Sequence, residues 1–243
     1  MPSIEIKDDK SVLIDKSCTI ILKNKDINIE YSFNNDNYTV LIFNDYDGDI
    51  VINDKGSINN SKVKINYIEL NNNKAGQLST ISVNDNSELE INSIYLGVNN
   101  KTITFDLRND KPDSKIEIYN NVVCLNDADF FLEIIGRISK GARRSVCHQK
   151  SHCLTIDSPK RAKVLPELLI DDNDVEASHS LSSGTIDEEI LFYMNSRGLS
   201  KAEALNLILK SYLMPNDDYY NDFEDGKLIQ EKAVLKVDQI CSM

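Results

Sequence analysis

Short segments in which apolar and polar residues alternate fill most of the first two thirds of this chain. Alternation with period two is typical of β-strands that bury one face, because successive side chains of a strand point to opposite sides. The clearest segments lie between Ser3 and about Thr155 and carry Ile4/Ile6, Ile27/Ile29/Tyr31/Phe33, Val40/Ile42, Val63/Ile65/Tyr67, Ile81/Val83, Ile103/Phe105/Leu107 and Ile116/Ile118. The pattern predicts an all-β region made of many short strands.

Clusters of Asn and Asp separate these segments, as at residues 34–37, 71–73 and 84–86. Such residues form turns, because their side chains bond to nearby backbone amides and they tolerate left-handed conformations. An antiparallel sandwich and a solenoid of stacked coils both fit the pattern. The strong strands return at irregular intervals of roughly 20 residues, the lower end of solenoid periods. The chain has only nine glycines, which disfavours sharp two-residue hairpins. The residues therefore favour an irregular β-helix.

The pattern changes after Asp187, where helical spacing replaces the alternation. Ser200 and Glu203 have the spacing of a capping box, in which each side chain bonds to the backbone amide of the other residue. The apolar stripe that follows ends at Pro215, since proline cannot continue a helix. A weaker amphipathic pattern covers residues 227–239 and predicts another helix.

We therefore expect a β-helix in residues 1–186 and a small helical domain in residues 187–243. Within the helical domain, residues 214–226 form an acidic linker between helices. The chain has 39 acidic and 27 basic side chains and a formal net charge of -12, which disfavours binding to nucleic-acid phosphates. No stretch approaches the roughly 20 apolar residues of a membrane-spanning helix, and no secretion signal precedes the strands. These features predict a cytoplasmic protein that binds neither nucleic acid nor membrane.

Two thiols and two imidazoles lie close together in the segment from Cys147 to Cys153. On an extended strand the two cysteines share one face, whereas His148 and His152 share the other. One strand therefore cannot surround a metal ion with all four, and zinc would need ligands from elsewhere. The five cysteines of the chain are widely spread and odd in number, which favours reduced thiols over a disulfide framework. We expect core cysteines and exposed histidines.

Other motifs are weaker. Residues 45–49 resemble the start of a calcium loop, but Ile50 and Gly56 stand where glycine and glutamate are needed, so an acidic turn is the better interpretation. The sequence has no phosphate-binding glycine loop, hydrolase elbow or zinc-protease motif, so these activities have no support and any energy would come from a partner. A basic stretch at residues 137–163 fits either a solvated surface or an acidic partner.

The segment at residues 136–212 resembles the C-terminal region of the SufB/SufD family of iron–sulfur cluster assembly proteins. The matching pieces are Gly136-Arg137-Ile138, Gly141-Ala142-Arg143-Arg144-Ser145, Pro166-Glu167-Leu168-Leu169-Ile170, Asp174-Val175-Glu176-Ala177-Ser178-His179, Gly184-Thr185-Ile186-Asp187, Leu191 to Leu199, and Glu203-Ala204. The resemblance implies a right-handed parallel β-helix with a C-terminal helical domain that docks a SufC-type ABC ATPase. It also implies pairing through the β-helix end with a SufB-like homologue or with a second copy, and a transient iron–sulfur cluster rather than an intrinsic cofactor.

The resemblance also assigns candidate site residues. His179 matches the histidine that SufD contributes near the cluster-assembly interface, and a neutral imidazole is a competent iron ligand. The alternative is a hydrogen-bonded histidine at the end of a β-helix coil. Ser151 stands at the position of the SufB scaffold cysteine, with Cys153 two residues later on the same strand face, and Ser180 replaces a SufB glutamate. The chain is therefore more similar to SufD than to SufB.

Partner-docking residues follow from the same resemblance. The positions that match the family's ATPase-docking stretch and helices are Phe192, Tyr193, Arg197, Gly198, Leu205, Ile208 and Leu209. The alternative is internal packing of the helices against the β-domain. Two other functions stay open: an interaction module without cluster chemistry, which Ser151 and Ser180 favour, and a carbohydrate-active β-helix enzyme, which the absence of Trp disfavours.

Overall fold

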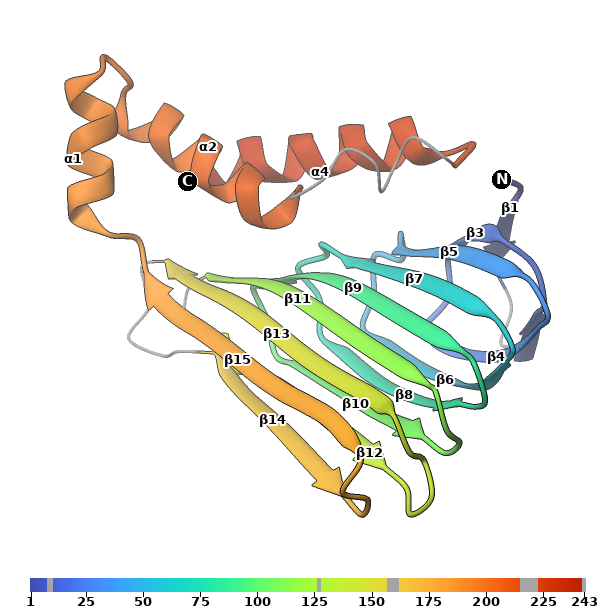
Figure 1. The fold of residues 1–243 in the computed structure, drawn as a ribbon. Coiled ribbons are helices and arrows are strands. Elements are labelled where there is room, and N and C mark those ends of the chain that lie inside the picture. Colours follow the sequence, from blue (N-terminus) through green and yellow to red (C-terminus); the bar gives the residue numbers. More distant parts are fainter. Residues whose placement is uncertain (8–10, 126–127, 157–161, 215–222, 242–243) are drawn as a thin grey trace.

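The structure is a computed structural model that describes residues 1–7, 11–125, 128–156, 162–214 and 223–241. Its strands wind into a β-solenoid of about six turns, followed by helices (Figure 1). All strand pairs between coils are parallel, which excludes the antiparallel sandwich and confirms the expected β-helix. Among the described residues, none of the helices has the length and apolar character needed to cross a membrane.

Two sheets form the solenoid, and we name them by the numbers of their strands. The odd sheet contains β1 (Ser3–Ile6), β3 (Cys18–Leu22), β5 (Asn37–Asn44), β7 (Lys62–Glu69), β9 (Glu88–Gly97), β11 (Lys115–Leu125), β13 (Ser145–Ile156) and β15 (Val175–Thr185). The even sheet contains β2 (Ser11–Ile14), β4 (Asp26–Asn34), β6 (Ile50–Asn59), β8 (Ala75–Val83), β10 (Lys101–Asn109), β12 (Phe130–Ile138) and β14 (Lys163–Ile170). The helices are α1 (Glu188–Ser196), α2 (Lys201–Leu213) and α4 (Gly226–Cys241).

The coils lengthen along the chain. Near the start Cys18 pairs with Val40, whereas near the end Glu117 pairs with His148, so the partners of the later pair lie further apart in the sequence. The expected interval of roughly 20 residues, the lower end of solenoid periods, is therefore too short. The coils become longer along the chain while the strands stay in register. This increase in coil length explains why the sequence shows no strict repeat.

Asparagines occupy one corner of successive coils, as the turn interpretation requires. Asn35, Asn60 and Asn86 have positive φ angles of 59°, 46° and 51°. Their side chains also bond between coils, since the Asn60 Nδ2 donates to Asn35 Oδ1 at 3.0 Å. Asparagine tolerates the left-handed conformation better than most residues, so it can make this corner repeatedly.

A chain of buried polar side chains lies within the interior. The Tyr95 hydroxyl donates to Gln77 Oε1 at 2.9 Å, and Gln77 Nε2 donates to Ser79 Oγ at 2.9 Å. Ser79 and Tyr67 then each donate to the Asp54 carboxylate at 2.6 Å. Burial raises the pKa of the Asp54 carboxyl to about 6, although these hydroxyl donors oppose the shift. The core therefore contains an ionisable group that titrates near neutrality.

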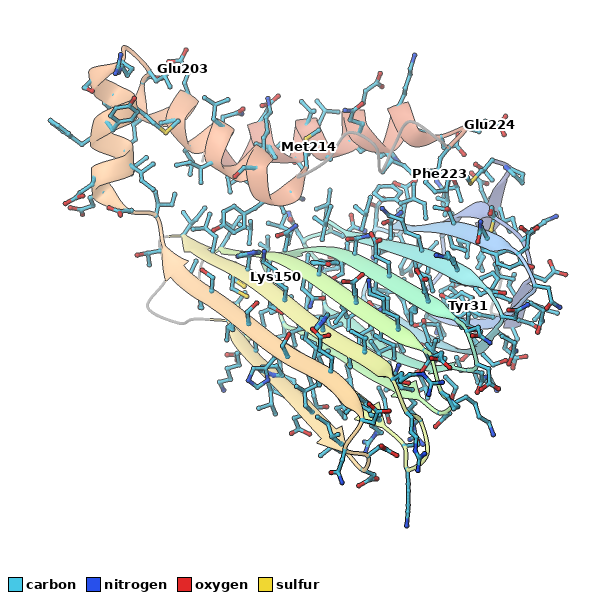
Figure 2. The ribbon with its side chains drawn as sticks, viewed as in Figure 1. Tyr31, Lys150, Glu203, Met214, Phe223 and Glu224 are labelled. Atoms are coloured by element: carbon cyan, nitrogen blue, oxygen red, sulfur yellow. The ribbon has the colours of Figure 1, made fainter. Side chains whose placement is uncertain are left out.

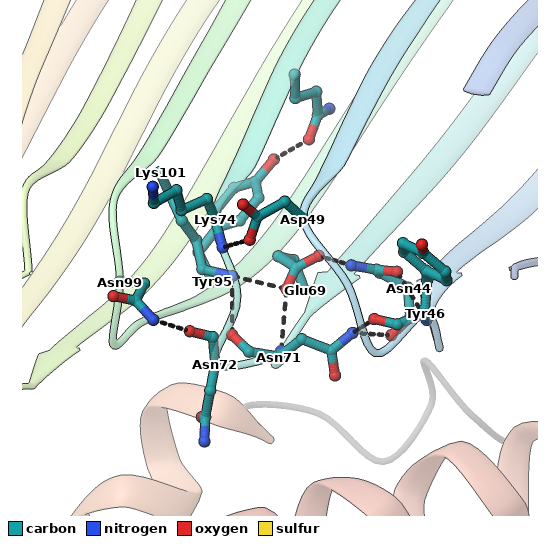
Figure 3. A network of polar contacts seen from close by, with 11 residues as sticks. Asn44, Tyr46, Asp49, Glu69, Asn71, Asn72, Lys74, Tyr95, Asn99 and Lys101 are labelled. Atoms are coloured by element: carbon teal, nitrogen blue, oxygen red, sulfur yellow. Dashed lines mark hydrogen bonds and ion pairs between the residues drawn. The ribbon is translucent and has the colours of Figure 1, made fainter. Parts of the chain in front are cut away.

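A second buried polar cluster lies at the carboxyl ends of the odd strands, next to the C-terminal helices (Figure 3). The Lys101 ammonium is fully buried and donates to Glu69 Oε1 at 2.7 Å and to the Asn71 carbonyl at 2.9 Å. The backbone amide of Asn71 and the side chain of Asn44 also donate to Glu69. Because each charge has several partners, the buried pair can form where an isolated ion could not.

The helices α2 and α4 lie along the outward face of the odd sheet near its carboxyl ends (Figure 1). Leu209 of α2 and Ile229, Ala233 and Val237 of α4 are fully buried against outward apolar side chains of this sheet, and Phe223 packs there as well (Figure 2). The helix that the sequence predicts at residues 227–239 is confirmed as α4. Residues 215–222 of the expected acidic linker lie outside the described residues.

Local signals place the helix ends. The strands end at Thr185, and Asp187 caps α1 by accepting a hydrogen bond from the amide of Glu189. The capping box of α2 is confirmed, since Ser200 Oγ accepts from the Glu203 amide and the Glu203 carboxylate accepts from the Ser200 amide. These bonds satisfy amides that the first helical turn leaves without partners.

Candidate functional site at the open end of the solenoid

The last coil leaves one end of the solenoid open. Among the described residues, β15 pairs only with β13, and β14 pairs only with β12. These edge strands contain 11 and 8 residues, whereas β1 and β2 at the other end contain four each. Short charged edges resist strand pairing, but a long edge offers a row of free backbone donors and acceptors. The open end is therefore the surface of the solenoid best suited to contact another chain.

His179 lies in the middle of this open end. It is on β15, in register with the buried Gln149 of β13, and so occupies an inward-facing position that no further coil covers. In the part of the chain that the structure describes, its ring has no hydrogen-bond partner and is exposed. Leu181 and Ile170, also on the last coil, are 45% and 43% exposed. An imidazole thus stands on a partly apolar surface.

Ser151 and Cys153 lie one coil deeper and face inward, as the alternation predicts. Ser151 is buried and accepts a hydrogen bond from Asn120 Nδ2 at 3.1 Å. Burial raises the pKa of the Cys153 thiol to about 12, so the thiol is protonated near neutral pH. The structure therefore brings these two residues behind the open end, on the inward face of the odd sheet, and only His179 reaches the surface.

The other thiol and the two remaining histidines separate as the sequence predicts. Cys147 faces the core, and burial raises its thiol pKa to about 12. His148 faces outward, where its Nδ1 lies 2.7 Å from Ser178 Oγ and its Nε2 lies 3.3 Å from Glu176. The part of the chain described here holds no group of three or more His, Cys, Asp or Glu side chains that could bind a metal ion.

Part of the basic stretch balances carboxylates of this chain. Arg137 Nε donates to Asp106 at 2.8 Å, and Arg144 forms a two-pronged contact with Asp113 in the preceding coil. Lys160 and Arg161, which belong to the same stretch, lie outside the described residues. The ion pairs between coils support the solvated-surface interpretation for these two arginines.

The candidate docking residues divide into two groups. Phe192 and Tyr193 of α1 are 75% and 58% exposed, and the Arg197 guanidinium lies 5.2 Å from the centre of the Tyr193 ring. Gly198 has a φ of +92° at the turn between α1 and α2, a conformation that other residues rarely adopt. Leu209 is instead fully buried, with Leu205 and Ile208 half-buried beside it. The structure thus assigns these three α2 side chains to internal packing and presents the aromatic side chains of α1.

Sequence reasoning missed Gln149. Its inward row is occupied in the earlier coils by Cys18, Val40, Ile65, Ile91 and Ile118. The change from apolar residues to Gln149 and then His179 marks the coils next to the open end. A glutamine at an inward position of an alternating strand is the signal that could have revealed it.

The solenoid, its open end and its packed helical tail define a parallel β-helix protein whose long edge strands, β14 and β15, lie at the same end. Residues 46–212 match the family model for the SufBD core domain of the SUF system of iron–sulfur cluster assembly. The chain therefore belongs to the SufBD family, as the sequence resemblance predicts.

Relatives agree with this assignment. The chain is 36% identical to the iron–sulfur cluster assembly protein SufD of Bacillus subtilis over 98 residues, which cover 40% of this chain and 22% of that protein. It is 35% identical over 80 residues to a SufBD family protein of Pyrococcus horikoshii, covering 33% and 18% of the two chains. SufD of Escherichia coli is 26% identical over 139 residues, covering 53% and 31%. The matched segments thus span less than a third of each relative.

Proposed function

We propose that this protein is a SufD-like, non-enzymatic component of a complex that assembles iron–sulfur clusters in the cytoplasm. In this proposal a SufC-type ATPase binds the helical tail and hydrolyses ATP, and the open end pairs with a SufB-like homologue or with a second copy. The cluster is cargo and is held transiently. Family membership supports the general role, and five free cysteines are typical of a reducing compartment.

The open end is the observation that carries the proposal. An unpaired edge of 11 residues with exposed apolar side chains is a template for strand addition and is typical of an interaction surface. Partner strands added to β15 and β14 would supply the missing backbone hydrogen bonds and cover Leu181 and Ile170. The same contact would bring partner side chains close to His179.

His179 is the residue through which the chain would contact iron. A neutral imidazole binds iron through a ring lone pair, and the exposed position leaves the ring accessible. One histidine cannot hold a cluster, so the other ligands would come from the partner. Cys153 would contribute only if the last coil opened, because its buried thiol is protonated.

The aromatic surface of α1 is the feature that supports ATPase docking. This helix has no buried residue, so its side chains add little to the fold. Aromatic side chains and arginine are enriched where protein partners bind. The buried side chains of α2 would act indirectly, by holding α1 in place at the end of the solenoid.

The first test is co-purification of the full chain with a SufC-type ATPase from the same source. We expect Phe192→Ala and Tyr193→Ala to reduce ATPase binding. Leu13→Ala is the matched control, because Leu13 is a similarly exposed apolar side chain at the opposite end of the solenoid. An equal loss of ATPase binding in all three variants, or no loss in any of them, would show that α1 is not the docking surface.

The second test is an anaerobic assay of iron and sulfide in the assembled complex. We expect His179→Ala to lower the cluster yield while the complex still forms, because the ring is not part of the core. His152→Ala, on the outward face of β13, is the control. An unchanged yield in His179→Ala would remove His179 from the site.

A second candidate function is an interaction module that keeps the fold and the partners but not the cluster chemistry. The buried, protonated Cys153 and the serine at position 151 favour it. The same assay separates the two functions, because the module would form the complex and hold no iron or sulfide.

A further inference from the structure

Gln149 has one unsatisfied polar atom directly behind the open end. Its side chain is buried, and its Nε2 donates to the carbonyl oxygens of Ile134 at 3.3 Å and Glu167 at 3.0 Å. Its Oε1 is buried and has no hydrogen-bond partner among the described residues. Buried acceptors are rarely left unpaired in proteins, so this atom requires an explanation.

The orientation of the Gln149 amide follows from its surroundings. Both atoms that contact the Nε2 end are carbonyl oxygens, which only an N–H can satisfy, so the amide cannot be reversed. Gly136 leaves the space for this arrangement, since a Cβ there would lie 2.8 Å from Gln149 Nε2. Two strands of the even sheet therefore hold the amide in place.

His179 is the residue of the last coil that pairs with Gln149. The two residues are directly paired between β13 and β15 and face inward in the same row. Lys150, the residue after Gln149, is exposed on the opposite face of the strand (Figure 2). A hydrogen-bond donor on β15 that reaches the Gln149 side chain must face inward at the position paired with Gln149. That residue is His179.

We propose that Gln149 positions the His179 imidazole. One ring N–H donates to Gln149 Oε1, and the other ring nitrogen keeps its lone pair and faces the open end. The bond requires the exposed ring to turn inward, and satisfying a buried acceptor favours that turn. Gln149 is thus a positioning residue that selects one neutral tautomer of the histidine.

This arrangement matches the way metal-binding histidines are held in proteins. The ring nitrogen that does not contact the metal donates to a fixed acceptor, which sets the tautomer and the direction of the lone pair. The inference rests on the proposed function, in which His179 contacts iron at the open end. It adds Gln149 as the residue that orients the His179 ring for metal binding.

The test is the tautomer of His179 in the full chain, measured by NMR of ¹⁵N-labelled histidine at a pH where the ring is neutral. The chain has three histidines, so His179→Gln assigns the signal. We expect one dominant tautomer in the wild-type protein and a mixture in Gln149→Met, which keeps the shape of the side chain but has no acceptor amide. With Zn²⁺ alone as the probe, the affinity at His179 should fall roughly 10-fold in this variant.

Thr155→Val is the matched control. Thr155 lies on the same strand and also has a buried hydroxyl without a partner among the described residues, but it pairs with Thr185 rather than His179. Its replacement should leave the tautomer unchanged. If Gln149→Met does not fold, Gly136→Ala provides a second variant, because the added Cβ would lie 2.6 Å from Cys147 Sγ and 2.8 Å from Gln149 Nε2 and should move the amide while Gln149 remains.

The outcomes are distinct. The same tautomer distribution in wild-type protein and Gln149→Met, or in wild-type protein and a folded Gly136→Ala, would overturn the inference. A change in Thr155→Val as large as that in Gln149→Met would also overturn it, because the effect would then be general. The measurement needs no cluster and no ATPase, so its failure differs from a failure of the proposed function, which the cluster assay with His179→Ala detects.

Discussion

Replacing Asp54 with asparagine should change how the stability of the protein depends on pH. The carboxyl is buried between the hydroxyls of Tyr67 and Ser79, and burial raises its pKa to about 6. In the unfolded chain the pKa is about 3.9. The native state therefore binds a proton that the unfolded state has already released between these two values.

The sign follows from this difference in proton binding. A carboxyl whose pKa is raised by folding contributes stability that is fully present below the unfolded pKa and is lost as the pH rises through about 6. From about pH 5 to about pH 7.5 the loss is about 1.4 kcal/mol, since the native carboxyl is about tenfold more protonated than ionised at pH 5 and almost fully ionised at pH 7.5, whereas the unfolded carboxyl is ionised throughout. Asparagine has no such titration, so the wild-type protein should lose this amount relative to Asp54→Asn.

Urea unfolding of both proteins at several pH values measures the difference. Carboxylates with lowered pKa values, such as Asp106 beside Arg137, are present in both proteins and cancel. A constant gap between the two proteins across this range, or a gap that changes in the opposite direction, would refute the reasoning. A titration of the Asp54 carboxyl carbon by NMR gives the native pKa directly.

Three further predictions concern the packing of the tail and the thiols. Leu209→Ala should lower the free energy of unfolding by about 2–5 kcal/mol, because the Leu209 side chain is fully buried. Phe192→Ala should change it by less than about 0.5 kcal/mol, because Phe192 is exposed. Similar losses for both variants in urea unfolding would contradict the packing of α2. Alkylation of the native protein followed by peptide mapping should label Cys241, the least buried thiol, before Cys153, whose pKa of about 12 leaves almost no thiolate; early labelling of Cys153 would show that the last coil opens. Lys232→Met should lower the free energy of unfolding by less than about 1 kcal/mol and should raise the rate of hydrogen exchange in α4. The reason is that the partly exposed Lys232 pairs with Asp45 across the contact between α4 and the solenoid. An unchanged exchange rate would show that apolar packing alone holds the helix.

Local signals in the sequence determined the elements of the fold. Alternation between Ile27 and Phe33 predicted a strand, the asparagines of residues 34–37 predicted its turn, and Ser200 with Glu203 predicted the start of α2. Each depends on a residue and its near neighbours in the chain, so the sequence is sufficient. The family resemblance at residues 136–212 also depends on local order and spacing, and the family model confirms it.

Only the tertiary structure decided what each side chain meets. Residues that pair between coils lie far apart in the chain. Because the coils also become longer, the sequence alone does not reveal which residues pair. For that reason the alternation could place Gln149 on an inward face but could not show that its Oε1 is buried without a partner, in the residue that pairs with His179. It could not show that Leu209 is buried while Phe192 is exposed, because both have helical spacing. Burial and hydrogen bonding between distant segments arise when the coils stack, and these contacts set the chemistry of the open end.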